Sequence, residues 1–336
     1  MRIKNNFKKP IGLFFLCVLT CSLAWASIIL GAKTLPFNIL YIDHSASFSQ
    51  EDSKYLSLVL KSREIRTVIG LLAGAALALS ACLAQAILRN PLAEPGLLGI
   101  NAGATLAILT FPFLPIFSHF NIFIQAFLGA IFSTILFYFI SGARRNNDPL
   151  RLLLTGATLN IFLFACVECL LFLAPQNIEY YHSWMIGSLN KQLDFPSLWL
   201  LFFLCSAIFI SFTFGPALNI MIFNDTLSTS LGVNSTHIRL VTLLFINFLA
   251  ACATALAGPI TFIGLCAPHF MRFFIGNDYR FLLPYSAFFG ACLLLLSDII
   301  ARIVLAPQEI QVGIVTSLIG APMLYFLIKK QSYENI

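Results

Sequence analysis

A few ionisable side chains lie inside long apolar runs of this 336-residue sequence, where charge is costly and usually functional. Asp298 and Arg302 stand four residues apart, a spacing that places an acid and a base on one face of a helix. Such a pair can relay protons or ions through a membrane, or form a structural ion pair, and we expect the ion pair. Glu168 has no partner nearby in the sequence. It could line a polar pathway or pair with another helix, and both readings stay open.

His269 is the other group that could do chemistry, because it follows Pro268 and precedes Arg272 by three residues. A metal ligand or a general base would need polar partners, and this segment offers none. We expect a polar anchor at a proline kink instead. The sequence also lacks a GxxxxGK[ST] phosphate-binding loop. The chain is therefore expected to have no catalytic residue, no metal site and no cofactor of its own, and not to be an enzyme.

The elements that must position these groups are membrane helices. The sequence is 59% hydrophobic and 10% charged, whereas a soluble domain carries about 25% charged residues. Its apolar runs continue for about 20 residues, which favours helices over the short alternating strands of a β-barrel. We expect an all-α, polytopic membrane protein of about ten transmembrane helices in one domain, residues 1–336, with an uncleaved first span near 10–31. The other expected spans lie near 64–88, 92–112, 117–141, 150–174, 193–214, 237–257, 260–276, 281–301 and 310–329.

Lys and Arg in the short loops predict the orientation, because they accumulate on the cytoplasmic side. With both termini in the cytoplasm, most of these residues stay inside, so we expect a multi-pass membrane protein with cytoplasmic termini. Arg63 and Arg66 are exceptions on the outer side, three residues apart and on one helical face. Their spacing supports two roles equally. They could snorkel to the interface, or they could dock an acidic partner.

A polar turn joins the second and third expected spans. Pro91 and Pro95 interrupt any continuous helix there. Gly96, Gly99 and Gly103 follow at spacings of three and four, which would place them on one face of the next helix. A glycine face lets another helix approach closely in lipid. We expect the turn to join two closely packed helices on the cytoplasmic side.

A second cytoplasmic segment lies between the sixth and seventh expected spans. Asn224 is a plausible N-cap, Asp225 suits the positive end of a helix dipole, and Gly232 is a plausible stop. A short helix here would offer its outer surface to a soluble partner. The alternative is a simple connector, although a loop of about 23 residues is long for that role.

Several separated motifs, each weak alone, are specific in combination. They are Arg63-x-x-Arg66, Asn90-Pro91-Leu92-Ala93-Glu94-Pro95-Gly96-Leu97-Leu98-Gly99, Trp184-x-x-Gly187-Ser188-Leu189, Leu231-Gly232-Val233, Gly258-Pro259-Ile260-x-Phe262-Ile263-Gly264-Leu265, Ala267-Pro268-His269-x-x-Arg272, Asp298-x-x-x-Arg302, Glu309-x-x-Val312-Gly313-Ile314 and Gly320-Ala321-Pro322. Together they resemble the permease subunits of ferric-siderophore, heme and cobalamin ABC importers. The resemblance covers roughly residues 60–330.

The resemblance implies a set of partners and roles. The partners are a second permease subunit, identical or a paralogue, two cytoplasmic ATPase subunits that use the ATP, an extracytoplasmic binding protein and membrane lipid, with no nucleic acid. The family usually has Ala in place of Ser228, which bears on the fit to the ATPase. The implied residues are Arg63, Arg66 and Arg302 for binding-protein docking; Asp225, Leu227, Ser228, Leu231 and Gly232 for ATPase coupling; and Asn90, Leu92, Thr155, Gly156 and Asn160 for the gate and pathway.

The function expected from this resemblance is a permease subunit that imports an iron-siderophore type chelate by alternating access. The resemblance also implies that the chain is a multi-pass protein of the bacterial cytoplasmic (inner) membrane. Cobalamin and heme permeases of the same family are alternatives. A gradient-driven secondary transporter is an alternative of another class, and it would need essential roles for Glu168 or Asp298. The sequence leaves open which chelate is carried, whether the permease pair is a homodimer or a heterodimer, and whether Glu168 lines the pathway.

Overall fold

The structure is a computed structural model that describes residues 8–31, 50–117, 119–142, 149–190, 195–221 and 235–334. Its regular elements in these ranges are all helical, which confirms the all-α class. They are α1 (Lys8–Ile29), α2 (Gln50–Ile87), η3 (Pro95–Leu98), α3 (Ile100–Thr110), η4 (Phe111–Phe113), α4 (Ile122–Ser141), α5 (Pro149–Leu173), η5 (Pro175–Asn177), α6 (Ile178–Met185), α7 (Phe195–Phe212), α8 (Gly215–Met221), α10 (Ser235–Ala257), α11 (Ile263–Ile275), α12 (Tyr279–Ile303) and α13 (Val312–Glu334).

Among the described helices, six are long and apolar enough to cross a membrane, and α7 with α8 forms a seventh candidate that is bent by 51°. Three further apolar helices are shorter: Ile100–Phe113, α11 and Val312–Phe326. The structure therefore agrees with the expected polytopic, all-α membrane protein.

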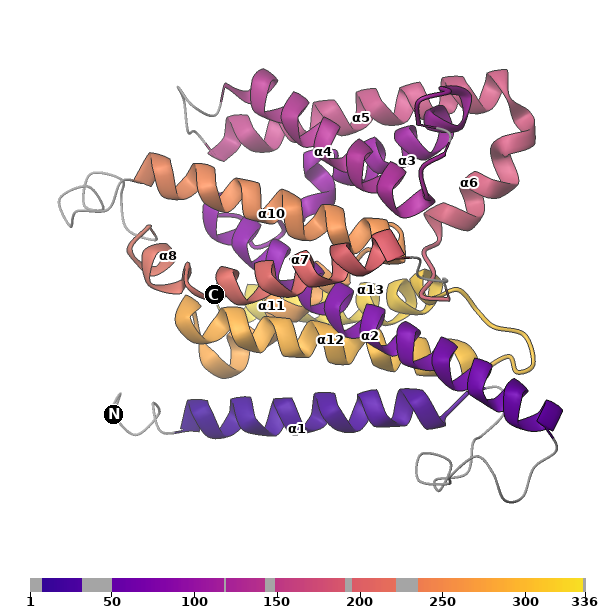
Figure 1. Cartoon of the computed structure of the whole chain (residues 1–336). Helices are drawn as coiled ribbons and strands as arrows, with labels where there is room; N and C mark the ends of the chain where they lie inside the picture. The colour runs from indigo at the N-terminus through magenta and orange to yellow at the C-terminus, as the bar shows by residue number, and fades with distance from the viewer. Residues whose placement is uncertain are drawn as a thin grey trace.

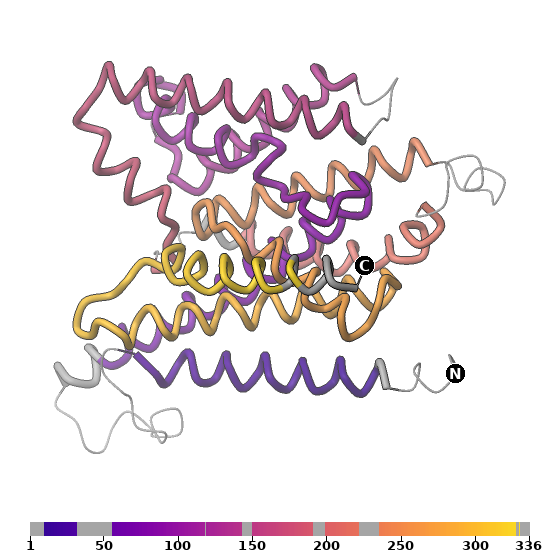
Figure 2. Tube along the Cα trace, turned by 180° about the vertical axis from the view of Figure 1, so that it is seen from behind, coloured from indigo at the N-terminus to yellow at the C-terminus, as the bar shows by residue number. Residues whose placement is uncertain are grey.

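The helices lie side by side around a buried centre. In Figure 1, α5, α4 and α3 lie together at the top, α10 and α7 lie below them, and α12 and α1 lie at the bottom. The central helix α2 contacts both α10 and α12. Figure 2 shows the same order from behind. The most buried spans are α2, α10 and α12, whereas α1 and α5 expose most of their surface.

Glycines allow a close crossing of α2 and α12. A Cβ added at Gly74 of α2 would lie 2.6 Å from the carbonyl oxygen of Gly290 and 2.9 Å from the Cα of Ala291, both on α12. No side chain fits between backbones at this separation. The two central helices therefore pack backbone to backbone, as small residues allow in membranes.

The expected glycine face after the polar turn is only partly right. Gly103 does pack closely, because a Cβ there would lie 2.6 Å from the carbonyl oxygen of Gly129 on α4. Gly99 instead adopts a left-handed conformation, with φ of 84°, and separates η3 from α3. Gly96 lies inside η3. The proline at the start of η3 and the left-handed glycine at its end break the helix, so the three glycines do not share one face.

Two other span expectations are corrected, and the structure contains one helix that the sequence did not predict. Helix α2 begins at residue 50 rather than near 64, the third span begins at Ile100 rather than near 92, and α6 was not expected at all. Charged residues precede the apolar part of α2, so a hydropathy profile does not detect the first turns of this helix. Helix α6 has eight residues and carries Glu179 and His182, so it is too short and polar to resemble a span.

Candidate functional site

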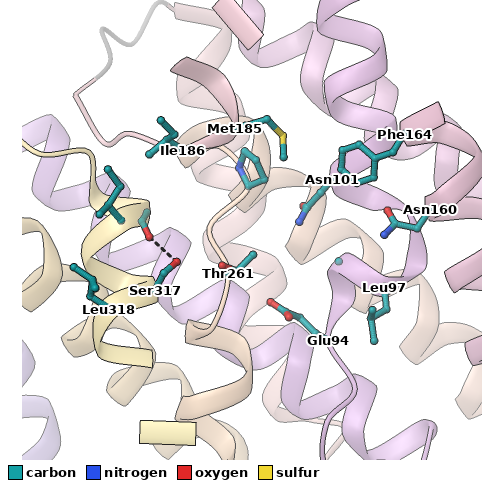
Figure 3. A pocket seen from close by; sticks show the side chains of 14 residues that line it. Glu94, Leu97, Asn101, Asn160, Phe164, Met185, Ile186, Thr261, Ser317 and Leu318 are labelled. Carbon is teal, nitrogen blue, oxygen red and sulfur yellow. Dashed lines mark hydrogen bonds between the residues drawn. The ribbon is translucent and has the colours of Figure 1, made fainter. Parts of the chain in front are cut away.

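A cavity of about 680 Å³ lies between the turn that precedes α3, the helices α5 and α13, and the break between α10 and α11. Its volume falls within the range of small-molecule sites. Figure 3 shows its lining from close by. The described residues that line it are Glu94, Gly96, Leu97, Asn101, Asn160, Phe164, Met185, Ile186, Pro259, Thr261, Gly313, Ile314, Ser317 and Leu318.

Glu94 is the ionisable residue among these fourteen, and no described lining residue is basic. Its side chain points across the cavity toward Thr261 (Figure 3). Glu94 lies in the turn between the helices, and burial there raises the pKa of its carboxyl to about 7, against the opposing effect of the backbone N–H of Phe262. The cavity therefore contains a carboxyl group that changes charge near neutral pH.

The remaining polar groups of the cavity are amides and hydroxyls. Asn101 accepts a hydrogen bond of 3.0 Å from Thr254 Oγ1 of α10, which fixes its side chain. Ser317 donates to the carbonyl oxygen of Gly313 over 2.8 Å, within its own helix (Figure 3). The Oδ1 atom of Asn160 is buried and has no hydrogen-bond partner in the structure. These groups can orient a solute without strong charge, and the rest of the lining is apolar.

The turn expected to form a gate is a tight, well-bonded structure. Asn90 Oδ1 accepts from the N–H of Leu92 over 2.9 Å, and the carbonyl of Asn90 accepts from Ala93 over 3.0 Å. Arg89 has a positive φ of 47°, and its Nη2 donates to the carbonyl of Met221 over 3.1 Å. The turn is thus attached to the end of α8. Asn90 and Leu92 do not themselves line the cavity, and Glu94 connects the turn to it.

The fifth-span residues expected to face a pathway have different environments. Asn160 lines the cavity, whereas Thr155 and Gly156 do not. Gly156 is buried, and a Cβ there would lie 2.7 Å from the carbonyl oxygen of Leu97. This glycine lets α5 pack directly on η3. Glu168 is exposed on α5 and is not part of the cavity lining.

The three arginines expected to dock a partner cluster at one end of the bundle. Arg63, Arg66 and Arg302 are only 9%, 6% and 2% exposed. Arg66 Nε donates to Asp298 Oδ1 over 2.8 Å, and its Nη1 donates to Glu309 Oε2 over 2.7 Å. Arg302 Nη2 lies 3.0 Å from Asp298 Oδ2, so these two residues form the ion pair that their spacing suggested.

Two of these arginines also hold the end of α1. Arg302 Nη1 donates to the carbonyls of Ser27 and Leu30 over 2.8 and 3.0 Å. Arg63 Nη1 donates to the carbonyls of Ile28 and Ile29 over 3.1 and 2.9 Å. The last carbonyls of a helix lack partners within it and carry partial negative charge, so cations stabilise them. The guanidinium groups therefore point into the protein.

Sequence reasoning missed Glu94 and Glu309 as functional candidates. Both lie in motifs quoted for the resemblance, but neither has a partner at helical spacing that would mark it.

His269 is buried, its ring lies 6.0 Å from that of Phe273, and both of its ring nitrogens lack a hydrogen-bond partner. The described residues hold no group of three potential metal ligands. The coupling residues Asp225, Leu227, Ser228, Leu231 and Gly232 lie outside the described residues.

Comparison with protein families decides the identity. The model of the FecCD transport family matches residues 17–330. The chain belongs to the FecCD transport family. The match includes the polar turn, the cavity lining and the arginine cluster, so these features lie within the FecCD fold.

Relatives of this FecCD chain match it over nearly its whole length. It is 35% identical to the ferric enterobactin transport system permease protein FepD of Escherichia coli, over 96% of this chain and 95% of that protein. It is 35% identical to the hemin transport system permease protein HmuU of Yersinia pestis, over 96% of each. A metal-chelate type ABC transporter solved in an inward-facing conformation superposes with a TM-score of 0.80 at 28% identity, covering 96% of this chain and 99% of that one.

Proposed function

We propose that this chain is the permease subunit of an ABC importer that moves an iron-siderophore type chelate across the bacterial cytoplasmic membrane. The observation that carries the proposal is the cavity of about 680 Å³ between the helices of a chain that the FecCD model matches over residues 17–330. Its mostly apolar wall holds a large solute weakly. Weak binding suits transport, because a site that held its cargo tightly in every state would retain it.

The energy for transport comes from partners. The sequence contains no phosphate-binding loop, so ATP is used by two cytoplasmic ATPase subunits. They act through residues Asp225–Gly232, and a second permease subunit completes the pathway. Both termini face the cytoplasm, as the distribution of Lys and Arg favours. The inner turn at Asn90 and Leu92 is then part of the gate, with Thr155, Gly156 and Asn160 on the adjacent helix.

An extracytoplasmic binding protein delivers the chelate at the opposite end. Arg63, Arg66 and Arg302 gather there and set its register on the permease through acidic residues of the partner. Their present hydrogen bonds are internal, so a docked protein would have to share or replace some of them. Arg66 is the best placed of the three for this role, because its partner Glu309 is 37% exposed in its side chain.

The test is uptake into liposomes that contain the purified permease with its ATPase, in the presence of the binding protein. We expect uptake of a radioactive iron chelate that requires ATP hydrolysis and persists after a protonophore removes the proton gradient. Hemin and cobalamin, each presented at the same concentration, test the other cargo classes. Uptake that needs a gradient and no ATPase would overturn the proposal in favour of a secondary transporter.

A further inference from the structure

We propose that Glu309 is an internal substitute for a carboxylate of the binding protein: it pairs with Arg66 in the free permease and leaves this arginine when the two proteins dock. This inference rests on the proposed function, in which acidic residues of the partner meet Arg66. Glu309 then belongs to the docking surface as a competitor of the partner and not as one of its contacts.

Two carboxylates share Arg66, and they differ in how easily they can leave it. Arg66 Nε donates to Asp298 Oδ1 over 2.8 Å, and Arg66 Nη1 donates to Glu309 Oε2 over 2.7 Å. The side chain of Asp298 is fully buried and also pairs with Arg302 over 3.0 Å, whereas that of Glu309 is 37% exposed. Separating Asp298 from Arg66 would leave charges buried without a partner, which is costly. Glu309 can instead return to water, so it is the exchangeable carboxylate of the two.

The solvent-exposed member of the pair is the acid. The side chain of Arg66 is only 7% exposed, much less than that of Glu309. A partner that approaches with acidic residues therefore meets the Glu309 carboxylate as well as the guanidinium group behind it. Like charges that face each other across an interface weaken binding. Close pairing of a partner carboxylate with Arg66 thus requires that Glu309 move away.

The backbone around Glu309 is fixed, so the exchange needs only a side-chain rotation. Glu309 lies in the connection between α12 and α13, and Figure 1 shows this connection at the same end of the bundle as the beginning of α2. The N–H of Ile310 donates to the carbonyl of Ala301 over 3.0 Å, and the N–H of Gln308 donates to that of Leu305 over 2.9 Å. These bonds hold the chain on both sides of Glu309. Its carboxylate can leave Arg66 while the connection keeps its fold.

The surface beside Glu309 also fits a protein that covers it. Val304 and Leu305, in the same connection, are exposed. Apolar side chains next to charged ones are a common composition of protein-binding surfaces. A partner that covers these residues excludes water from Arg66, and an ion pair is stronger where water is excluded. The new pair with the partner can therefore replace the solvated pair with Glu309.

The test measures the affinity of the purified binding protein for the permease–ATPase complex in lipid nanodiscs at low salt. Glu309→Gln keeps the size of the side chain and removes its charge. We expect it to bind about two- to fivefold more tightly than the wild type, the range that loss of a competing exposed ion pair predicts. The matched control is Glu64→Gln, which removes a negative charge from an exposed position of α2 and leaves both carboxylate partners of Arg66 in place. It should change the affinity much less.

A double-mutant cycle assigns the gain to Arg66. In folded Arg66→Met permease, isolated by size-exclusion chromatography, Glu309→Gln should give no gain, because the group that Glu309 occupies is absent. Should Glu309→Gln itself fail to fold, Glu309→Asp is measured in its place with the same expectation. Its shorter side chain weakens the contact with Arg66 and keeps the charge.

The outcomes separate this inference from the proposed function. If the wild type does not bind the binding protein, the proposed function fails, and the exchange fails with it. If the wild type binds and Glu309→Gln binds equally or more weakly, only the exchange is overturned. Equal gains for Glu309→Gln and Glu64→Gln would overturn it too, because the cause would then be general repulsion. A gain specific to Glu309 that is lost with Arg66→Met supports the exchange.

Discussion

Arg302 of α12 donates from its Nη1 atom to the backbone carbonyl of Ser27 in α1, over 2.8 Å. These residues are 275 positions apart in the chain. The same guanidinium group donates from Nη2 to Ser27 Oγ over 2.8 Å, and Ser27 Oγ lies 2.9 Å from Thr67 Oγ1 of α2. The peripheral helix α1 is therefore attached to the two central helices at its end by charge-assisted bonds.

Asp298 should be essential for stability. It is fully buried and contacts both Arg66 and Arg302, so Asp298→Ala removes the carboxylate paired with Arg302 and one of the two paired with Arg66. Removing one partner of a buried pair costs about 3–5 kcal/mol. We expect a large fall in the midpoint of thermal unfolding of the detergent-solubilised protein, and a smaller fall for Asp298→Asn, which keeps one acceptor oxygen. Glu64→Ala, exposed on α2, is the control. Equal midpoints for Asp298→Ala and the control would contradict the structural role.

Docking can be separated from stability with two pairs of substitutions. Arg63→Glu with Arg66→Glu places repulsive charge toward an acidic partner and also breaks internal bonds. Arg63→Met with Arg66→Met breaks the same bonds without reversing the charge. We expect both double variants to be destabilised, and the glutamate pair to bind the binding protein more weakly at low salt. The measurement is binding of the purified partner to folded permease. Equal affinity of the two pairs would exclude a docking role for this charge.

The crossing of α2 and α12 should not tolerate a larger residue. A Cβ at Gly290 would lie 2.5 Å from the carbonyl of Gly74, so Gly290→Leu forces the central helices apart. Overpacking of this kind costs about 1–3 kcal/mol or more. We expect a strong loss of folded protein in size-exclusion chromatography. Gly276→Ala is the comparison, because no atom lies within 4 Å of its added Cβ and only its φ of 79° opposes the change. Similar yields of the two variants would refute backbone-to-backbone packing.

Stability should depend on pH through Glu94. Its folded-state pKa is raised to about 7, so the folded protein retains this proton at pH values where the unfolded chain has released it. The stabilisation of the folded state by the protonated Glu94 is therefore complete below the ordinary glutamate pKa, and it is lost as pH rises through about 7. The titratable group that faces Glu94 from α11 is the Cys266 thiol. We expect the unfolding midpoint to fall between pH 5 and pH 8 more steeply in the wild type than in Glu94→Gln. If the unfolding midpoints of the wild type and Glu94→Gln changed in parallel with pH, this role of Glu94 would be contradicted.

The sequence alone predicted the class of the protein and most of its spans, because apolar runs long enough to cross a membrane are a local property of the chain. It also predicted the pairing of Asp298 with Arg302, since residues four apart meet on one helix. It did not predict that Arg63 and Arg302 bond to α1. Those acceptors are carbonyls, which every residue has and no side-chain pattern reveals.

The polar turn shows where local reasoning ends. Its prolines predicted the break between helices, and this is correct because proline acts on its own backbone. The prediction of three glycines on one face failed at Gly99, whose left-handed conformation depends on how η3 meets α3. Glu94 and Thr261 line one cavity although they lie far apart in the sequence, and only the packing of the helices brings them together. The sequence by itself thus determined helices, breaks and family, through forces that act along the chain. The tertiary structure decided the partners of each buried charge, because those partners come from distant helices.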